Sequence, residues 1–88
     1  MKQKKTERQI MIENDVSNFC KNFRTKKAKL TLRQIHEKTG VNIKTLSGFE
    51  NGRSSNMFML NHYYVAYDFD KGVQSSFIQG MNEIIGRL

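Results

Sequence analysis

Two short helical stretches with a glycine between them, within residues 32–51, constrain the fold more than any other part of the chain. Thr31 followed three residues later by Gln34 is a capping-box pattern, and we expect the helix that it begins to end near Lys38. Gly40 then offers a residue that adopts positive φ without strain, as a sharp turn between helices usually requires. The pattern therefore predicts two short helices joined by a tight turn.

The second helix of this stretch, 42–51, has two different faces. Asn42 is a good N-cap, and Gly52 stands where a helix-ending glycine is expected. At about 100° per residue, Leu46 and Phe49 fall on one side, which we expect to be buried. The opposite side is small and polar with one positive charge, and it comprises Lys44, Ser47, Gly48 and Asn51, with Ile43 at its edge. Such a surface suits a helix that lies in the major groove of DNA.

The positive charge of the chain is unevenly distributed. The 88 residues carry a formal net charge of +7. Residues 1–30 hold nine lysines and arginines against three acidic residues, whereas the remaining residues hold six against five. On a chain this short, such a charge indicates a polyanionic partner, and nucleic acid before a membrane surface. The alternative is a solvated basic segment that aids solubility.

Length and apolar patterning exclude several classes of protein. Eighty-eight residues make one small domain, and apolar spacing without proline favours helices nearly throughout. No apolar run approaches about 18 residues, so we expect no membrane span, and residues 1–9 lack the apolar core of a secretory signal. A single cysteine, Cys20, excludes an intramolecular disulfide. These features fit a cytoplasmic protein.

We expect residues 1–9 to form a flexible basic arm and residues 10–88 to form a single domain. The domain would begin with a helix over 10–27, whose apolar residues fall within one stripe of about 100°. The stripe comprises Ile12, Val16, Phe19, Cys20 and Phe23. Because Cys20 lies inside the stripe, we interpret it as a small apolar filler rather than a reactive thiol.

A further helix is expected at 56–68, after a polar loop in which Ser54 or Ser55 provides the N-cap. Its apolar positions are Met57, Leu60, Tyr64 and Tyr67, with Tyr63 beside them and Phe58 and Val65 on a second flank. We interpret these methionines and aromatic residues as core, rather than as a platform on which bases stack.

The end of the chain predicts a turn and then an amphipathic helix. Residues 68–74 have the composition of a turn, and Ser76 with Gln79 forms a second capping box that opens a helix over 76–87. Its apolar residues share one stripe of about 100°. They are Phe77, Ile78, Met81, Ile84, Ile85 and Leu88. The stripe either completes the core of the monomer or pairs with its copy in a homodimer, and we expect a share of both.

Residues 30–53 resemble the helix-turn-helix of phage repressor and Cro-like regulators, the lambda-repressor-like or XRE-type family. The positions that match or substitute conservatively are Leu30, Thr31, Ile35, Gly40, Val41, Thr45, Leu46, Ser47, Glu50 and Gly52. With the helices on each side, the resemblance extends over residues 13–68. It implies an all-α, compact five-helix domain in which the second helix crosses the DNA backbone and the third enters the major groove.

The resemblance also implies which side chains meet DNA. Those expected to face base edges or the nearby backbone are Asn42, Ile43, Lys44, Ser47 and Gly48. Those expected at phosphates are Thr31, Arg33, Thr45, Asn51 and Arg53. We add Lys26, Lys27 and Lys29, which a helix end would set against a phosphate backbone, although cations there also favour the helix itself. Lys44 can donate to guanine and Ile43 can contact a thymine methyl, whereas Gly48 only permits close approach.

Two positions depart from the family's pattern, and a third carries a charge that needs a partner. Leu32 stands where the family usually has a glutamine that braces the backbone, so that contact is not carried over. His36 replaces the usual small alanine where the two helices cross. We interpret it as a packed, neutral histidine, with a pH-sensitive wedge as the alternative. Glu50 would lie beside the phosphate surface and needs a cation, which the family often supplies from the first helix, here Arg24 or Lys21.

These observations favour a sequence-specific DNA-binding regulator of transcription, a repressor of phage or mobile-element type that binds double-stranded DNA as a homodimer. The alternative is a protein–protein interaction module, antitoxin-like or an adaptor, that uses the apolar last helix. An enzyme is not expected, because paired carboxylates, a nucleophile with a neighbouring base and a glycine-rich phosphate loop are all missing. One cysteine and two histidines have no metal-ligand spacing, so we expect no metal and no cofactor. The basic arm suits a minor groove or RNA.

Overall fold

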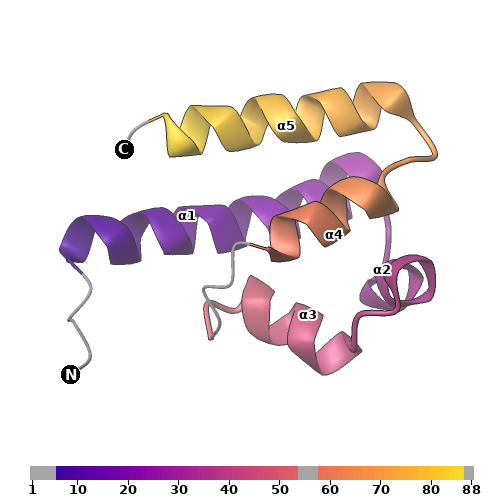
Figure 1. Ribbon diagram of the computed structural model, residues 1–88, viewed down its shortest axis with the longest axis horizontal. Helices are drawn as coiled ribbons and strands as arrows, with labels where there is room; N and C mark the ends of the chain where they lie inside the picture. The colour runs from indigo at the N-terminus through magenta and orange to yellow at the C-terminus, as the bar shows by residue number, and fades with distance from the viewer. Residues whose placement is uncertain (1–5, 54–57, 87–88) are drawn as a thin grey trace.

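In the part of the chain that the structure describes there are five α-helices, and the first of them continues as a short π-helix. In the computed structural model, residues 6–53 and 58–86 are described. In chain order the elements are α1 (Glu7–Asn22), the π-helix η1 (Phe23–Ala28), α2 (Leu32–Thr39), α3 (Ile43–Glu50), α4 (Met59–Ala66) and α5 (Lys71–Ile85) (Figure 1). The expected compact, all-α architecture with five helices is confirmed. Within the described ranges, no helix has the length and apolar character needed to cross a membrane.

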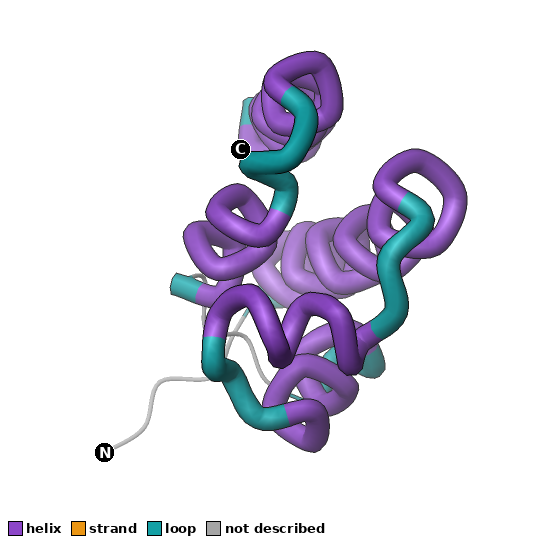
Figure 2. The backbone as a smooth tube through the Cα atoms, turned by 90° about the vertical axis from the view of Figure 1, so that its right-hand side faces the viewer, coloured by secondary structure: helices purple, strands orange, loops and turns teal. Residues whose placement is uncertain are grey.

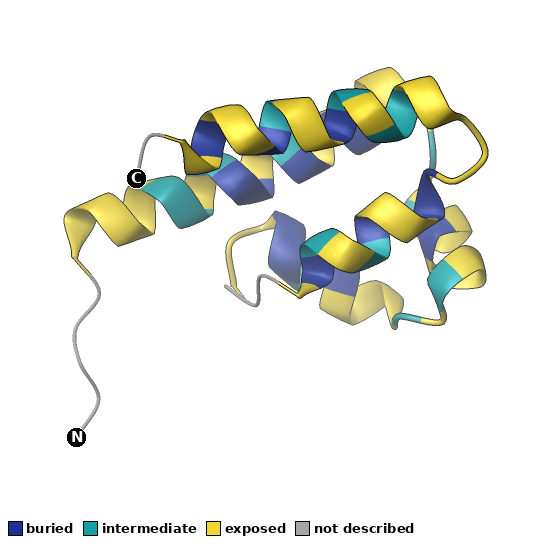
Figure 3. Cartoon of the chain, turned by 45° about the horizontal axis from the view of Figure 1, so that its top comes forward, coloured by how far each residue is buried: buried dark blue, intermediate teal, exposed yellow. Residues whose placement is uncertain are grey.

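The two longest helices, α1 and α5, lie side by side and run in opposite directions (Figure 1). Gly80 of α5 allows this close approach, since a Cβ atom at that position would lie 2.5 Å from two ring carbons of Phe19 in α1. Seen at right angles, the short helices α2 and α3 follow one another through a brief loop (Figure 2). Buried residues lie on the faces that the helices turn towards one another (Figure 3). All five helices therefore share one core.

The centre of the core is rich in aromatic side chains. Its largest fully buried members are Tyr63, Tyr67, Phe49, Phe77, Ile35, Leu46, Val16 and Cys20. The ring of Phe77 packs against Phe23 and Tyr67, with centroid distances of 5.3 Å to each. Cys20 is fully buried, and burial raises the pKa of its thiol well above the ordinary value. The interpretation of this cysteine as an apolar filler is therefore confirmed.

Capping boxes begin the first two helices. In α2, the backbone N–H of Gln34 donates to Thr31 Oγ1 at 3.1 Å, and the backbone N–H of Thr31 donates to Gln34 Oε1 at 2.7 Å, as predicted. In α1, Thr6 and Gln9 form an equivalent box, so the helix begins at Glu7 rather than at the predicted residue 10. The correction arises because two orphan N–H groups of the first turn are satisfied there by side chains.

The first helix ends in a backbone conformation that sequence analysis did not predict. Six residues of η1 form a π-helix, and Lys29 follows with φ 55°, in the left-handed region. The N–H of Leu30 then donates to the carbonyl of Arg24 at 3.0 Å. A π-helical turn is rare, and a left-handed lysine is uncommon. Together they end the helix one residue later than predicted and turn the chain towards α2.

The predicted faces of the fourth helix were partly wrong. Residues 54–57, which include the two predicted serine caps and Met57, lie outside the described residues, and α4 spans Met59–Ala66. Its buried face is formed by Met59, Tyr63, Ala66 and Tyr67. Tyr64, Val65 and Phe58 are instead 38%, 47% and 82% exposed. α4 packs against α2 and α5, and the flank of Phe58 and Val65, which was interpreted as core, is exposed.

The last helix begins earlier than predicted. Asp70 is its N-cap, and its carboxylate accepts hydrogen bonds from the N–H groups of Gly72 at 2.8 Å and Val73 at 3.2 Å. The predicted turn at 68–74 and the predicted helix 76–87 are thus corrected to α5 at Lys71–Ile85, with Ser76 inside it. A carboxylate at this position accepts hydrogen bonds from two N–H groups that have no partner within the helix. It also interacts favourably with the positive end of the helix dipole.

Candidate nucleic-acid interface

The turn between α2 and α3 is held by local hydrogen bonds. Gly40 has φ 77°, and its N–H donates to the His36 carbonyl at 2.7 Å. The N–H of Val41 donates to Thr39 Oγ1 at 3.2 Å. The ring Nδ1 of His36 donates to the Val41 carbonyl at 2.8 Å, and the side chain is exposed. The expectation of a packed histidine at the helix crossing is therefore wrong, because the ring points outwards and closes the turn.

The amphipathic character predicted for α3 is present. Asn42 is its N-cap and accepts a hydrogen bond from the N–H of Lys44 at 2.8 Å. Leu46 and Phe49 are buried in the core, at 0% and 1% exposure. The predicted base-reading residues lie on the outside: Asn42, Ile43 and Lys44 are exposed, and Ser47 and Gly48 are half-buried. We refer to these five residues as the reading face.

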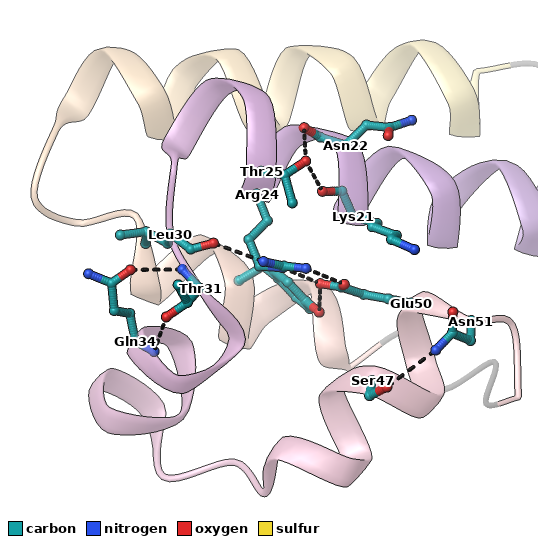
Figure 4. Close-up of polar contacts among 11 residues, drawn as sticks. Lys21, Asn22, Arg24, Thr25, Leu30, Thr31, Gln34, Ser47, Glu50 and Asn51 are labelled. Atoms are coloured by element: carbon teal, nitrogen blue, oxygen red, sulfur yellow. Dashed lines mark hydrogen bonds and ion pairs between the residues drawn. The ribbon is translucent and has the colours of Figure 1, made fainter.

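The far end of α3 is anchored by a buried ion pair. Arg24 of η1 donates from Nε to Glu50 Oε2 at 2.7 Å and from Nη2 to Oε1 at 2.9 Å (Figure 4). Its Nη1 donates to the carbonyl of Leu30, and the hydroxyl of Tyr63 donates to Glu50 Oε2 at 2.7 Å. Of the two predicted partners, Arg24 rather than Lys21 therefore neutralises Glu50. Glu50 is 4% exposed, so its carboxylate is buried rather than displayed on the surface.

This cluster of polar groups is tightly coupled. The hydrogen bond to Glu50 raises the pKa of Arg24 above its ordinary value. Burial and the hydrogen bond to Glu50 raise the pKa of Tyr63 well above its ordinary value. A bidentate arginine–carboxylate pair has a fixed geometry as well as favourable energy. The cluster thus ties η1, the entry to α2, the end of α3 and α4 together.

Several predicted phosphate residues gather beside the first turn of α3. Lys29, Thr31 and Arg33 line a hollow of about 670 Å³ together with Ile43 of the reading face. All three side chains are exposed, and Arg33 also pairs with Glu37 at 3.5 Å on the surface. The other predicted lysines of this group, Lys26 and Lys27, are exposed on η1 but do not line the hollow.

The remaining predicted phosphate residues lie at the other end of α3 or along it. Asn51 Nδ2 donates to Ser47 Oγ at 3.2 Å, so this amide adjoins the reading face. The N–H of Arg53 donates to the Gly48 carbonyl at 2.8 Å, after Gly52 with φ 76° has turned the chain. Thr45 is exposed on α3 itself. The reading face is therefore flanked by polar and basic residues at both ends.

The predicted dimerisation stripe is mostly used inside the monomer. Phe77, Met81 and Ile84 are 1%, 4% and 7% exposed, because they pack in the shared core. Ile78 and Ile85 are 42% and 36% exposed, and Leu88 lies outside the described residues. Of the described stripe, these two isoleucines remain available to a partner, and dimerisation through them stays a prediction.

Two surface features were not predicted from the sequence. One is a groove of about 860 Å³ on the outside of α5, lined by Tyr64, Lys71, Ser75, Ile78, Asn82 and Glu83 among others. The other is a polar cleft of about 320 Å³ between α1 and the turn after α3, lined by Asn14, Ser17, Asn18, Lys21, Glu50, Asn51 and Gly52. The spacing of Asn14, Asn18 and Lys21 on one helix face was a signal that could have indicated the cleft.

Over residues 6–53 and 58–86, no group of three histidine, cysteine, aspartate or glutamate side chains is placed to hold a metal ion. Comparison with models of protein families, with curated protein sequences and with solved structures gives no match.

Proposed function

We propose that this protein is a sequence-specific DNA-binding regulator of transcription, in which α2, the Gly40 turn and α3 act as a helix-turn-helix. The observation that carries the proposal is the outward exposure of Asn42, Ile43 and Lys44 at the first turn of a helix whose other side is buried. In helix-turn-helix proteins, the first residues of the recognition helix contact base edges in the major groove. These three residues offer an amide, a methyl-bearing surface and a cation to that groove.

Flanking cations support the same proposal. Lys29 and Arg33 lie beside Ile43, and Arg53 follows the other end of α3. Phosphate contacts position a protein on the duplex, whereas base contacts select the sequence. A reading helix with polar and basic residues at both ends is suited to bridge the two strands that border a major groove.

The buried anchor of α3 also favours recognition. Because Arg24 and Tyr63 hold Glu50 from two sides, the helix is set in one orientation before any ligand arrives. Binding by a preorganised surface loses less conformational entropy than binding by a loop that must order first.

The proposal includes a homodimer that represses transcription by blocking a promoter, which requires no activating surface. One helix reads only a few base pairs, so two copies on a symmetric operator supply the needed specificity. The groove along α5 supports this part, because Lys71 lies in the first turn of the helix and Glu83 in its last turns. Antiparallel pairing of two copies about a twofold axis would set each Lys71 near Glu83 of the copy.

Selection of bound sequences from a pool of random duplexes tests the proposal. We expect enrichment of a palindromic site, and a solution mass measurement should give a dimer on it. Lys44→Ala should abolish the sequence preference, whereas Lys26→Ala should weaken binding to all duplexes alike and reduce the salt dependence. If both variants affect selected and random duplexes equally, the assigned reading face is wrong.

A second function, a protein–protein interaction module, is favoured by the same groove. Tyr64 and Ile78 are 38% and 42% exposed there and give it an apolar floor that a partner helix could cover. The selection experiment separates the two functions, since a module that acts only through partner proteins enriches no DNA sequence.

A further inference from the structure

Apart from Asn51, the exposed residues of the polar cleft between α1 and the end of α3 have no part in the function proposed above. On one side it is bordered by Asn14, Asn18 and Lys21 of α1, and on the other by Asn51 and Gly52. The three α1 residues follow the spacing i, i+4, i+7, which places them in one row along the helix. All three are exposed, so the row is open to solvent along its length.

The cleft is continuous with the reading face. Asn51 lines the cleft and also donates to Ser47 Oγ in the middle of the polar side of α3. Figure 4 shows Lys21 on α1 and Asn51 at the end of α3, with Ser47 one turn back along α3. Further along the same edge, Thr25 and Lys29 share a hollow with Ile43. Residues of α1 and η1 therefore line cavities that lie beside both ends of α3.

The charge of the cleft favours an anion. Glu50 is the acidic residue among those that line it, and both of its carboxylate oxygens are already engaged, by Arg24 and by the Tyr63 hydroxyl. The positive charge of Lys21 is therefore not cancelled by this buried carboxylate. The amide groups of Asn14 and Asn18 add N–H donors, which protein–DNA interfaces commonly direct at phosphate oxygens.

We propose that this cleft binds a phosphate of the DNA backbone, with Lys21 supplying the charge and the Asn18 and Asn14 amides donating hydrogen bonds. The inference rests on the DNA binding proposed above and adds α1 to the interface. A duplex that lies against the reading face would then have one strand held along α1, while α3 enters the groove beside that strand.

The test uses two isosteric variants that add the same negative charge at different places. Asn18→Asp puts a carboxylate in the cleft, whereas Asn61→Asp puts one on the exposed side of α4. We expect Asn18→Asp to weaken binding to selected and random duplexes alike, by roughly tenfold at low salt, and Asn61→Asp to weaken it far less.

Two further measurements test the same cleft. Lys21→Ala should reduce the slope of log affinity against log salt by about 1. Side-chain amide NMR signals of Asn14 and Asn18 should shift on titration with a random duplex, and that of Asn61 should not.

The outcomes separate this inference from the proposed function. If the wild-type protein selects a sequence but Asn18→Asp and Asn61→Asp bind alike, the cleft proposal is overturned and the proposed function stands. If Asn18→Asp weakens binding while Lys44→Ala leaves the sequence preference intact, the cleft proposal stands and the reading face falls. If the wild-type protein binds no duplex, both are overturned. Circular dichroism of each variant excludes unfolding as the cause of a loss.

Discussion

The two ends of α3 differ sharply in what surrounds them. At the first turn, Asn42, Ile43 and Lys44 are exposed, and the hydrogen bond from the Lys44 N–H to Asn42 Oδ1 is a local cap. At the last turn, Glu50 is buried and bound to groups from η1 and α4, 26 and 13 residues away in sequence. The contrast indicates a division of roles: one end stabilises the fold, and the other is free to contact a ligand.

Removal of the arginine should give the largest effect. In Arg24→Leu, the Glu50 carboxylate would remain buried without its cation, and we expect a loss of about 3–5 kcal/mol in the free energy of unfolding. Urea denaturation measures the loss. Lys21→Ala, which removes an exposed cation from the same helical segment, is the matched control and should change stability by less than about 0.5 kcal/mol. Similar losses in the two variants would contradict the division of roles.

The two buried tyrosines provide a sharper comparison within the anchored end. Tyr63→Phe removes the hydrogen bond to charged Glu50 and should cost about 1.5–3 kcal/mol. Tyr67 is equally buried, but its hydroxyl has no hydrogen-bond partner among the described residues. Tyr67→Phe removes an unsatisfied polar group and should be neutral or stabilising. Thermal denaturation of both variants checks the order, and a greater loss for Tyr67→Phe would refute it.

Alkaline pH should weaken the same end of the molecule. Burial raises the pKa of both Tyr63 and Tyr67, so in the unfolded chain these phenols ionise near their ordinary pKa of about 10 while the folded protein keeps them neutral. The stability is therefore fully present below about pH 10 and falls as the pH rises further, by up to about 1.4 kcal/mol per pH unit for each tyrosine. Unfolding measured from pH 8 to 11 should show a shallower fall in Tyr67→Phe, and an unchanged profile would argue against the raised pKa.

Substitutions at the exposed end should have the smallest effects on stability. Asn42→Ala removes the N-cap and should cost about 1 kcal/mol. Lys44→Ala should change the unfolding free energy by less than about 0.5 kcal/mol, although it is expected to abolish sequence preference. Denaturation and DNA binding measured on the same samples test whether stability and recognition are separable. A strongly destabilised Lys44→Ala protein would remove the distinction between the two ends.

The elements that sequence analysis predicted well are those with local signals. Thr31, Gln34, Gly40 and Asn42 act on backbone groups within three or four residues, so their patterns specify α2, the turn and the start of α3 without knowledge of the fold. The partner of Glu50 was predicted only as either Arg24 or Lys21, because the sequence pattern of the first helix does not determine which basic side chain points inwards.

The errors concern features set by distant contacts or by competing caps. Asp70 and Ser76 are both good cap residues, and the choice between them depended on how much of the segment could pack on the core. In α4, apolar residues occur around most of the helix, so the sequence did not reveal which side would be covered. The row of Asn14, Asn18 and Lys21 carried a pattern, but its place beside α3 follows only from the packing of α1.

The polar anchor of α3 also limits how far this structure can be reduced to a smaller unit. A peptide that covers residues 30–53 would contain both short helices and the turn but would lack Arg24 and Tyr63, the groups that hold Glu50. Grafting that segment onto another scaffold would therefore transfer the reading face without the means of orienting it. A transplantable version needs a matching guanidinium and phenol from the host, or the whole stretch from α1 through α4.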